Sequence, residues 1–159
     1  MPKWSRWLLV SFGVIVLDQL TKLWVAAVFQ LGDKLAVAPS FNLVLAYNTG
    51  AAFSLLADAG GWQRLFFSAV AVVASAVIVH LLRRHPGQPL FSLALSLILG
   101  GALGNLIDRV AYGHVIDFIQ VYWRDWYWPA FNVADSAITV GAVLLVWDSF
   151  RKPKAVAHG

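Results

Sequence analysis

The chain has 159 residues, a net charge of +4 and no cysteine, and 60% of its residues are hydrophobic against 13% charged. Globular chains are about 45–50% apolar and about 25% charged, and a soluble domain this small could not bury so much apolar surface. The composition excludes a disordered chain, a disulfide-stabilised domain and a nucleic-acid-binding protein. It predicts an integral membrane protein, with residues 1–159 forming a single domain.

Four apolar stretches are long enough to cross a bilayer as helices, which takes about 20 residues. They cover residues 7–28, 63–82, 90–107 and 133–150. The last two are short, and each is expected to extend by a turn at one end. A cleavable leader is the competing interpretation of the first stretch, because residues 36–38 resemble a cleavage site. The length of this stretch, its charged residues Asp18 and Lys22, and Pro39 after the site favour a retained helix.

The basic residues predict how the four helices are oriented. Seven of them flank the chain ends and the connection between the second and third stretches: Lys3, Arg6, Arg83, Arg84, Arg151, Lys152 and Lys154. The opposite side has Lys34, Arg64 and Arg124. By the positive-inside rule, both termini are expected in the cytoplasm, and residues 29–62 and 108–132 on the outer side.

The two outer segments carry signals for a small β element. Residues 41–47 and 114–122 are strand-like, and residues 51–59 are expected to form a short amphipathic helix on the membrane surface. Four aromatic residues after the second strand suit the headgroup region: Trp123, Trp126, Tyr127 and Trp128. The predicted fold is therefore a membrane all-α protein of four helices with a small outer β element.

All eight acidic residues are aspartates, and several lie inside the predicted helices. An ionisable group in a span costs about 2.5–3.5 kcal/mol or more and marks a functional candidate. Asp18 and Lys22 lie four residues apart on one face of the first span, and Asn105, Asp108 and Arg109 share the outer end of the third. A structural explanation is also open: Asp18 with Lys22, and Asp108 with Arg109, would neutralise each other as ion pairs.

Two further motifs have structural interpretations. Asn132 is placed to cap the fourth helix, with Asp135 in its first turn near the positive end of the helix dipole. Gly100 and Gly104 form a small-xxx-small motif, which predicts close packing of the third helix against a neighbour.

Five sequence blocks together resemble the bacterial lipoprotein signal peptidases (signal peptidase II) over nearly the whole chain. The blocks are DQLTK (18–22), YNTGAAFS (47–54), GGALGNLIDR (100–109), GHVIDF (113–118) and FNVADS (131–136). The resemblance implies a four-helix protein of the bacterial inner membrane, with a β cradle and a surface helix at the periplasmic face. It also implies an aspartyl endopeptidase that cuts prolipoproteins just before their diacylglyceryl-modified cysteine, and inhibition by the cyclic peptide globomycin.

Carried over position by position, the resemblance makes Asp117 and Asp135 the catalytic pair. Nine residues would bind substrate or support the pair: Asp18, Lys22, Asn48, Gly50, Asn105, Asp108, Arg109, Asn132 and Ala134. Two carboxylates close together share one proton, so that one can activate water while the other donates to the substrate carbonyl. No metal or cofactor is expected, and the default oligomeric state is a monomer in contact with membrane lipid.

The sequence also offers candidates for the residues that contact the substrate. We expect Asn48 or Asn132 to orient the substrate backbone, and Arg109 to hold a carboxylate or carbonyl group.

Other mechanisms fit the residues less well. A serine protease would need Ser54 or Ser136 beside Lys22 as the base, but Asp18 keeps that lysine charged. A metal enzyme would use the two aspartates with His114, but no H-E-x-x-H spacing occurs. The alternative outside enzymes is a small transporter or channel that uses the intramembrane Asp and Lys residues, but the chain has no inverted repeat.

Overall fold

The computed structural model describes residues 3–50 and 62–151 of the chain. The helices are α1 (Arg6–Val28), α2 (Trp62–Arg84), α3 (Pro89–Tyr112) and α4 (Val133–Phe150), and each is long and apolar enough to cross a membrane. The strands are β1 (Lys34–Ala38), β2 (Phe41–Asn48), β3 (Val115–Trp123) and β4 (Trp126–Tyr127). The four predicted spans are thus confirmed as helices. The surface helix predicted for residues 51–59 lies outside the described residues.

The expected extension of the two short spans is confirmed for α3 and wrong for α4. Helix α3 runs on to Tyr112 and stops there because Gly113 adopts φ 83°, in the left-handed region that ends many helices. Helix α4 begins at Val133 because the side chain of Asn132 caps it, and it ends at Phe150 as predicted.

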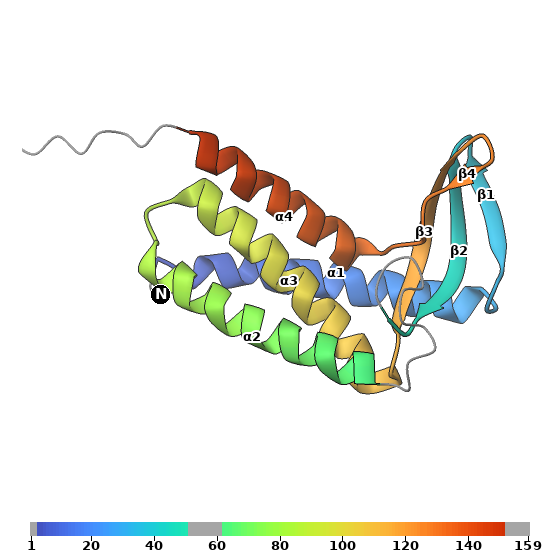
Figure 1. Ribbon diagram of the computed structural model, residues 1–159, viewed down its shortest axis with the longest axis horizontal. Helices are drawn as coiled ribbons and strands as arrows, with labels where there is room; N and C mark the ends of the chain where they lie inside the picture. The colour runs from blue at the N-terminus through green and yellow to red at the C-terminus, as the bar shows by residue number, and fades with distance from the viewer. Residues whose placement is uncertain (1–2, 51–61, 152–159) are drawn as a thin grey trace, which may run out of the picture.

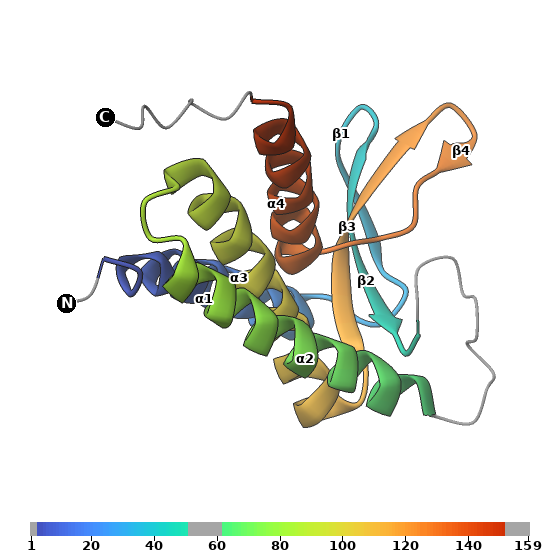
Figure 2. The ribbon, with the colours of Figure 1, turned by 60° about the vertical axis from the view of Figure 1, so that its left-hand side comes forward.

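Helix α3 lies at the centre of the bundle and packs against α1, α2 and α4 (Figures 1 and 2). Its glycines allow this close approach. A Cβ atom on Gly100 would lie 2.7 Å from Val14 Cβ of α1, and one on Gly104 would lie 2.7 Å from Asp18 Oδ2. The packing role predicted for this glycine pair is confirmed.

The strands form one antiparallel sheet in the order β1-β2-β3-β4, at the end of the bundle away from the start of α1 and the end of α4 (Figure 1). The strand-like segments predicted at 41–47 and 114–122 are β2 and β3, whereas β1 and β4 were not predicted. The sheet rests on α1 through a buried cluster of Val25, Leu45, Ile116 and Phe118. In the pairing of β2 with β3, Ala46 lies opposite Asp117 and Asn48 opposite Val115. This register brings the end of β2 beside the start of β3.

Two hairpin aromatics predicted at the membrane interface are well exposed. Trp123 and Trp126, at the turn between β3 and β4, are 69% and 61% exposed. Their place at the headgroup level stays a prediction.

Candidate active site

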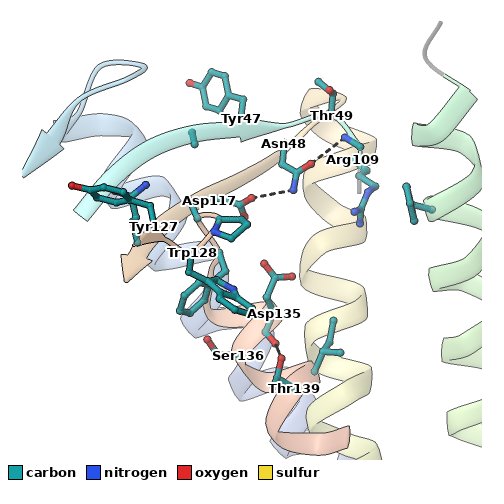
Figure 3. Close-up of a pocket in the computed structure, with 18 of the residues that line it drawn as sticks. Tyr47, Asn48, Thr49, Arg109, Asp117, Tyr127, Trp128, Asp135, Ser136 and Thr139 are labelled. Atoms are coloured by element: carbon teal, nitrogen blue, oxygen red, sulfur yellow. Dashed lines mark hydrogen bonds between the residues drawn. The ribbon is translucent and has the colours of Figure 1, made fainter. Parts of the chain in front are cut away.

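Four polar side chains from four different elements line one cavity of about 1210 Å³ beside the sheet (Figure 3). They are Asn48 at the end of β2, Arg109 near the end of α3, Asp117 in β3 and Asp135 in the first turn of α4. The two aspartates are far apart in the sequence and open into the same space. The structure therefore brings together the two carboxylates that the sequence singled out.

Asp117 is a buried carboxylate held by two asparagines. The Asn132 side-chain amide donates to its Oδ1 at 2.8 Å, and the Asn48 amide donates to its Oδ2 at 3.2 Å. Burial, and then the charge of Asp135, raise the pKa of Asp117 to about 7, although both hydrogen bonds and Lys22 lower it. The effect of burial is the larger one, because removing the charged carboxylate from water costs more free energy than the two hydrogen bonds contribute to its stability.

Asp135 both caps its helix and faces the cavity. Its backbone N–H donates to Asn132 Oδ1 at 2.9 Å, and the Asn132 N–H donates back to Asp135 Oδ2 at 3.3 Å, which completes a capping box. Its other oxygen, Oδ1, accepts a 2.8 Å bond from the Asn105 amide. The predicted cap is confirmed, and it does not remove Asp135 from the site.

The two predicted substrate-orienting asparagines differ in their surroundings. Asn132 is fully buried, and its amide lies within hydrogen-bond distance of Asn105, Ile116 and Asp117. Asn48 lines the cavity, and its Oδ1 accepts the backbone N–H of Gly50 at 3.1 Å. The geometry favours Asn48 for contact with a bound chain.

A buried ion cluster lies under the pair of aspartates. The Lys22 ammonium is 2.8 Å from Asp18 Oδ2 and 2.8 Å from Asp108 Oδ2, and 3.0 Å from Asn105 Oδ1. The predicted Asp18–Lys22 pair is confirmed. The expected pairing of Asp108 with Arg109 is wrong, because Asp108 turns to Lys22 instead.

Arg109 is directed to the cavity. Its guanidinium lies 5.4 Å from the centre of the Phe67 ring and donates to the Asn105 carbonyl oxygen at 3.4 Å. Neither contact uses a carboxylate, and Arg109 places a positive charge at the cavity wall, where it interacts with the charges of Asp135 and Asp117.

Sequence reasoning missed Gln19. Its amide nitrogen lies 2.9 Å from Asp108 Oδ1, 3.3 Å from Asp18 Oδ2 and 3.2 Å from the Gly104 carbonyl oxygen. Gln19 could have been predicted from the sequence, because it is a long polar side chain inside an apolar span, one position from Asp18.

In the described part of the chain, the site offers little to a metal ion or to Ser136 as a nucleophile, whereas Ser54 lies outside the described residues. Among residues 3–50 and 62–151, no group of three His, Cys, Asp or Glu side chains is placed to hold a metal ion. The Ser136 hydroxyl donates to the Asn132 carbonyl oxygen at 2.9 Å, whereas Lys22 is held within its own cluster. The chemistry that this arrangement supports is acid–base catalysis by two carboxylates.

The chain is similar to several known proteins. The family model described as signal peptidase (SPase) II matches residues 10–151. The lipoprotein signal peptidase of Paraburkholderia phytofirmans is 63% identical over 148 residues, 93% of this chain and 86% of that protein. That of Cupriavidus necator is 59% identical over 146 residues, 92% of this chain and 83% of the relative. Two solved structures of a bacterial membrane enzyme superpose with TM-scores of 0.80 and 0.82, at 32% and 31% identity. They cover 94% and 93% of this chain, and 93% and 94% of their own chains.

Proposed function

Because the chain belongs to the signal peptidase II family, we propose that Asp117 and Asp135 are the two carboxylates with which it removes signal peptides from prolipoproteins. One observation carries this assignment: two aspartates from different elements open into one cavity, and a single residue, Asn132, holds both. Family membership also sets aside the alternative of a transporter or channel.

The proposed reaction needs one ionised and one protonated carboxylate. With the pKa of Asp117 raised to about 7, Asp117 keeps its proton in a large share of the molecules near neutral pH. The ionised member takes a proton from a water, whose oxygen attacks the scissile carbonyl carbon, while the protonated member donates to the carbonyl oxygen. The aspartate that took the water proton then delivers it to the nitrogen of the leaving residue, the other aspartate takes back a proton from a hydroxyl group of the tetrahedral intermediate, and the C–N bond breaks. Neither aspartate is acylated.

The cavity walls suit a substrate with a lipid anchor. The cavity lining includes Phe67 of α2 and Ile138 and Val140 of α4, which are apolar. We place the acyl chains of a diacylglyceryl-cysteine against these residues. Asn48 and Arg109 lie at the polar rim, where they would bind carbonyl oxygens of the extended peptide.

The remaining family expectations are part of the proposal. The enzyme would lie in the bacterial inner membrane, with the sheet and the dyad at the periplasmic face and both termini in the cytoplasm. Globomycin would bind in the same cavity and place a hydroxyl group between the two aspartates. Turnover would need one copy of the chain.

The test is cleavage of a lipidated prolipoprotein by the purified protein in detergent. Asp117→Asn and Asp135→Asn are each expected to lower kcat by at least about a thousandfold, because neither variant can share a proton between two carboxylates. Asp125→Asn, in the turn between β3 and β4, is the matched control and is expected to retain full activity. EDTA and serine-directed acylating reagents should leave the wild type active, and globomycin should inhibit it. A loss of only a few-fold in either dyad variant would remove that residue from the pair.

A further inference from the structure

Each proposed catalytic aspartate follows a residue whose backbone is held by another, buried carboxylate. The N–H of Ile116, just before Asp117, donates to Asp108 Oδ2 at 3.1 Å. The N–H of Ala134, just before Asp135, donates to Asp18 Oδ1 at 2.8 Å. Strand β3 and helix α4 are thus each anchored one residue before the reacting side chain.

The two anchoring carboxylates are joined to one another. Lys22 bridges them, with its ammonium 2.8 Å from each, and the side chains of the three residues are at most 1% exposed. A continuous chain of contacts therefore runs from the backbone before Asp117, through Asp108, Lys22 and Asp18, to the backbone before Asp135.

This chain of contacts has one ammonium for two buried carboxyl groups, whose oxygens need further hydrogen-bond donors. Gln19 supplies a donor there, since its amide nitrogen lies within hydrogen-bond distance of both Asp18 and Asp108. The same nitrogen reaches the carbonyl oxygen of Gly104, so the side chain is fixed against α3 as well. A buried carboxylate without enough donors is costly, so this contact stabilises the whole arrangement.

We propose that Gln19 is a positioning residue which, with Lys22, locks Asp18 and Asp108 together and so fixes the spacing of the two catalytic aspartates. This inference rests on the proposed function of Asp117 and Asp135. It assigns Gln19 no contact with substrate.

The spacing matters because it sets how strongly the dyad shares its proton. Charged groups reach Asp117 from three helices: Asp135 in α4, Lys22 in α1 and Arg109 in α3. Asp135 raises the pKa of Asp117, so a wider separation lowers that pKa, and water entering the gap lowers it further. Weakening the contacts that hold Asp18 and Asp108 together therefore moves the alkaline limb of the kcat/KM profile to lower pH.

The main test is Gln19→Met, which keeps the length and apolar stem of the side chain and removes its donor. We expect a fall in kcat of about ten- to a hundredfold per folded molecule, with KM within about twofold and the alkaline limb at lower pH. The matched control is Thr21→Val on the same turn of α1, because the Thr21 hydroxyl bonds to the Leu17 and Asp18 carbonyl oxygens of its own helix. The control should keep the wild-type kcat and pH profile.

A second variant tests the inference if Gln19→Met does not fold. Gln19→Glu has the same shape but donates a hydrogen bond only when protonated. Its activity relative to wild type is expected to rise as the pH falls from about 8 to about 5, because protonation restores the donor. A ratio that does not change with pH overturns the proposal, and so does a Gln19→Met enzyme with wild-type kcat and pH profile. Asp117→Asn in the same assay separates the two proposals: if it is active the dyad assignment fails, and if it is inactive only the role of Gln19 is in question.

Discussion

The side-chain amide of Asn132 donates a 2.8 Å hydrogen bond to Asp117 Oδ1. This bond stabilises the charged form of a carboxylate that burial would otherwise keep protonated, and the Asn48 amide adds a second bond of 3.2 Å. The pKa of Asp117, raised to about 7, is therefore a balance between burial and donors.

That balance predicts the pH dependence of the enzyme. Below the raised pKa Asp117 holds a proton, and above it the dyad carries two negative charges, so kcat/KM should fall as the pH rises through about 7. Asn48→Ala removes a donor that lowers the pKa, so its alkaline limb should move to higher pH. The measurement is kcat/KM for a lipidated peptide from about pH 5 to 9. An alkaline limb that stays in place would show that the Asn48 bond has no influence on Asp117.

The ion cluster predicts an unequal response to loss of its charges. Lys22→Met leaves Asp18 and Asp108 facing each other without a cation, and should cost about 3–5 kcal/mol of stability. Asp18→Asn should cost less, because Lys22 and Asp108 still neutralise each other. The double variant should be more stable than Lys22→Met alone, since one uncompensated carboxylate remains instead of two. Thermal unfolding in detergent measures all three. Losses that simply add in the double variant would mean that Asp18 and Lys22 are not coupled.

The close approach of α3 to the cluster predicts a contrast between two glycines. A Cβ atom on Gly104 would lie 2.7 Å from Asp18 Oδ2 and 3.4 Å from the Ala134 Cβ, so Gly104→Ala should cost about 1–3 kcal/mol and lower kcat. A Cβ atom on Gly13 of α1 would meet nothing within 4 Å. Gly13→Ala should therefore be neutral or stabilising by up to about 1 kcal/mol, because alanine is the better helix former. Equal effects of the two substitutions on unfolding temperature would contradict this reasoning.

The orientation in the membrane predicts the behaviour of reporter fusions. The start of α1 and the end of α4 lie at one end of the bundle, and the seven flanking basic residues favour the cytoplasm for that end (Figure 1). A reporter that is active only in the periplasm should be inactive when fused after His158 and active when fused after Arg124. The reverse pattern would invert the topology.

The sequence alone was sufficient to predict the helices, and it singled out the two aspartates that the structure places in one cavity. Long apolar runs and the cap at Asn132 marked the helices, and the resemblance to known peptidases singled out Asp117 and Asp135. It was insufficient for β1, whose five residues are all exposed and are held to β2 by backbone pairing. A strand with no buried face need not alternate apolar and polar side chains, so its sequence pattern does not predict it.

The partners inside the membrane were harder to predict, for a geometric reason. Asp108 and Arg109 are adjacent in sequence, but neighbours on a helix point about 100° apart. Asp108 therefore forms an ion pair with Lys22 of another helix, while Arg109 lines the cavity. Gln19 was missed for the same reason, because its contact with Asp108 depends on the packing of α1 against α3.

The placement of α2 and α4 on opposite sides of α3 has a kinetic consequence (Figures 1 and 2). The cavity takes its apolar wall from both helices, and Val140 in that wall is 51% exposed on the outside of the bundle. A lipid-anchored substrate then arrives by two-dimensional diffusion, and its effective concentration is a surface density. If more lipid is added while the molar amount of substrate stays constant, the substrate is diluted in the bilayer and turnover should slow. Rate constants for this enzyme should therefore be expressed against the mole fraction of substrate in the lipid.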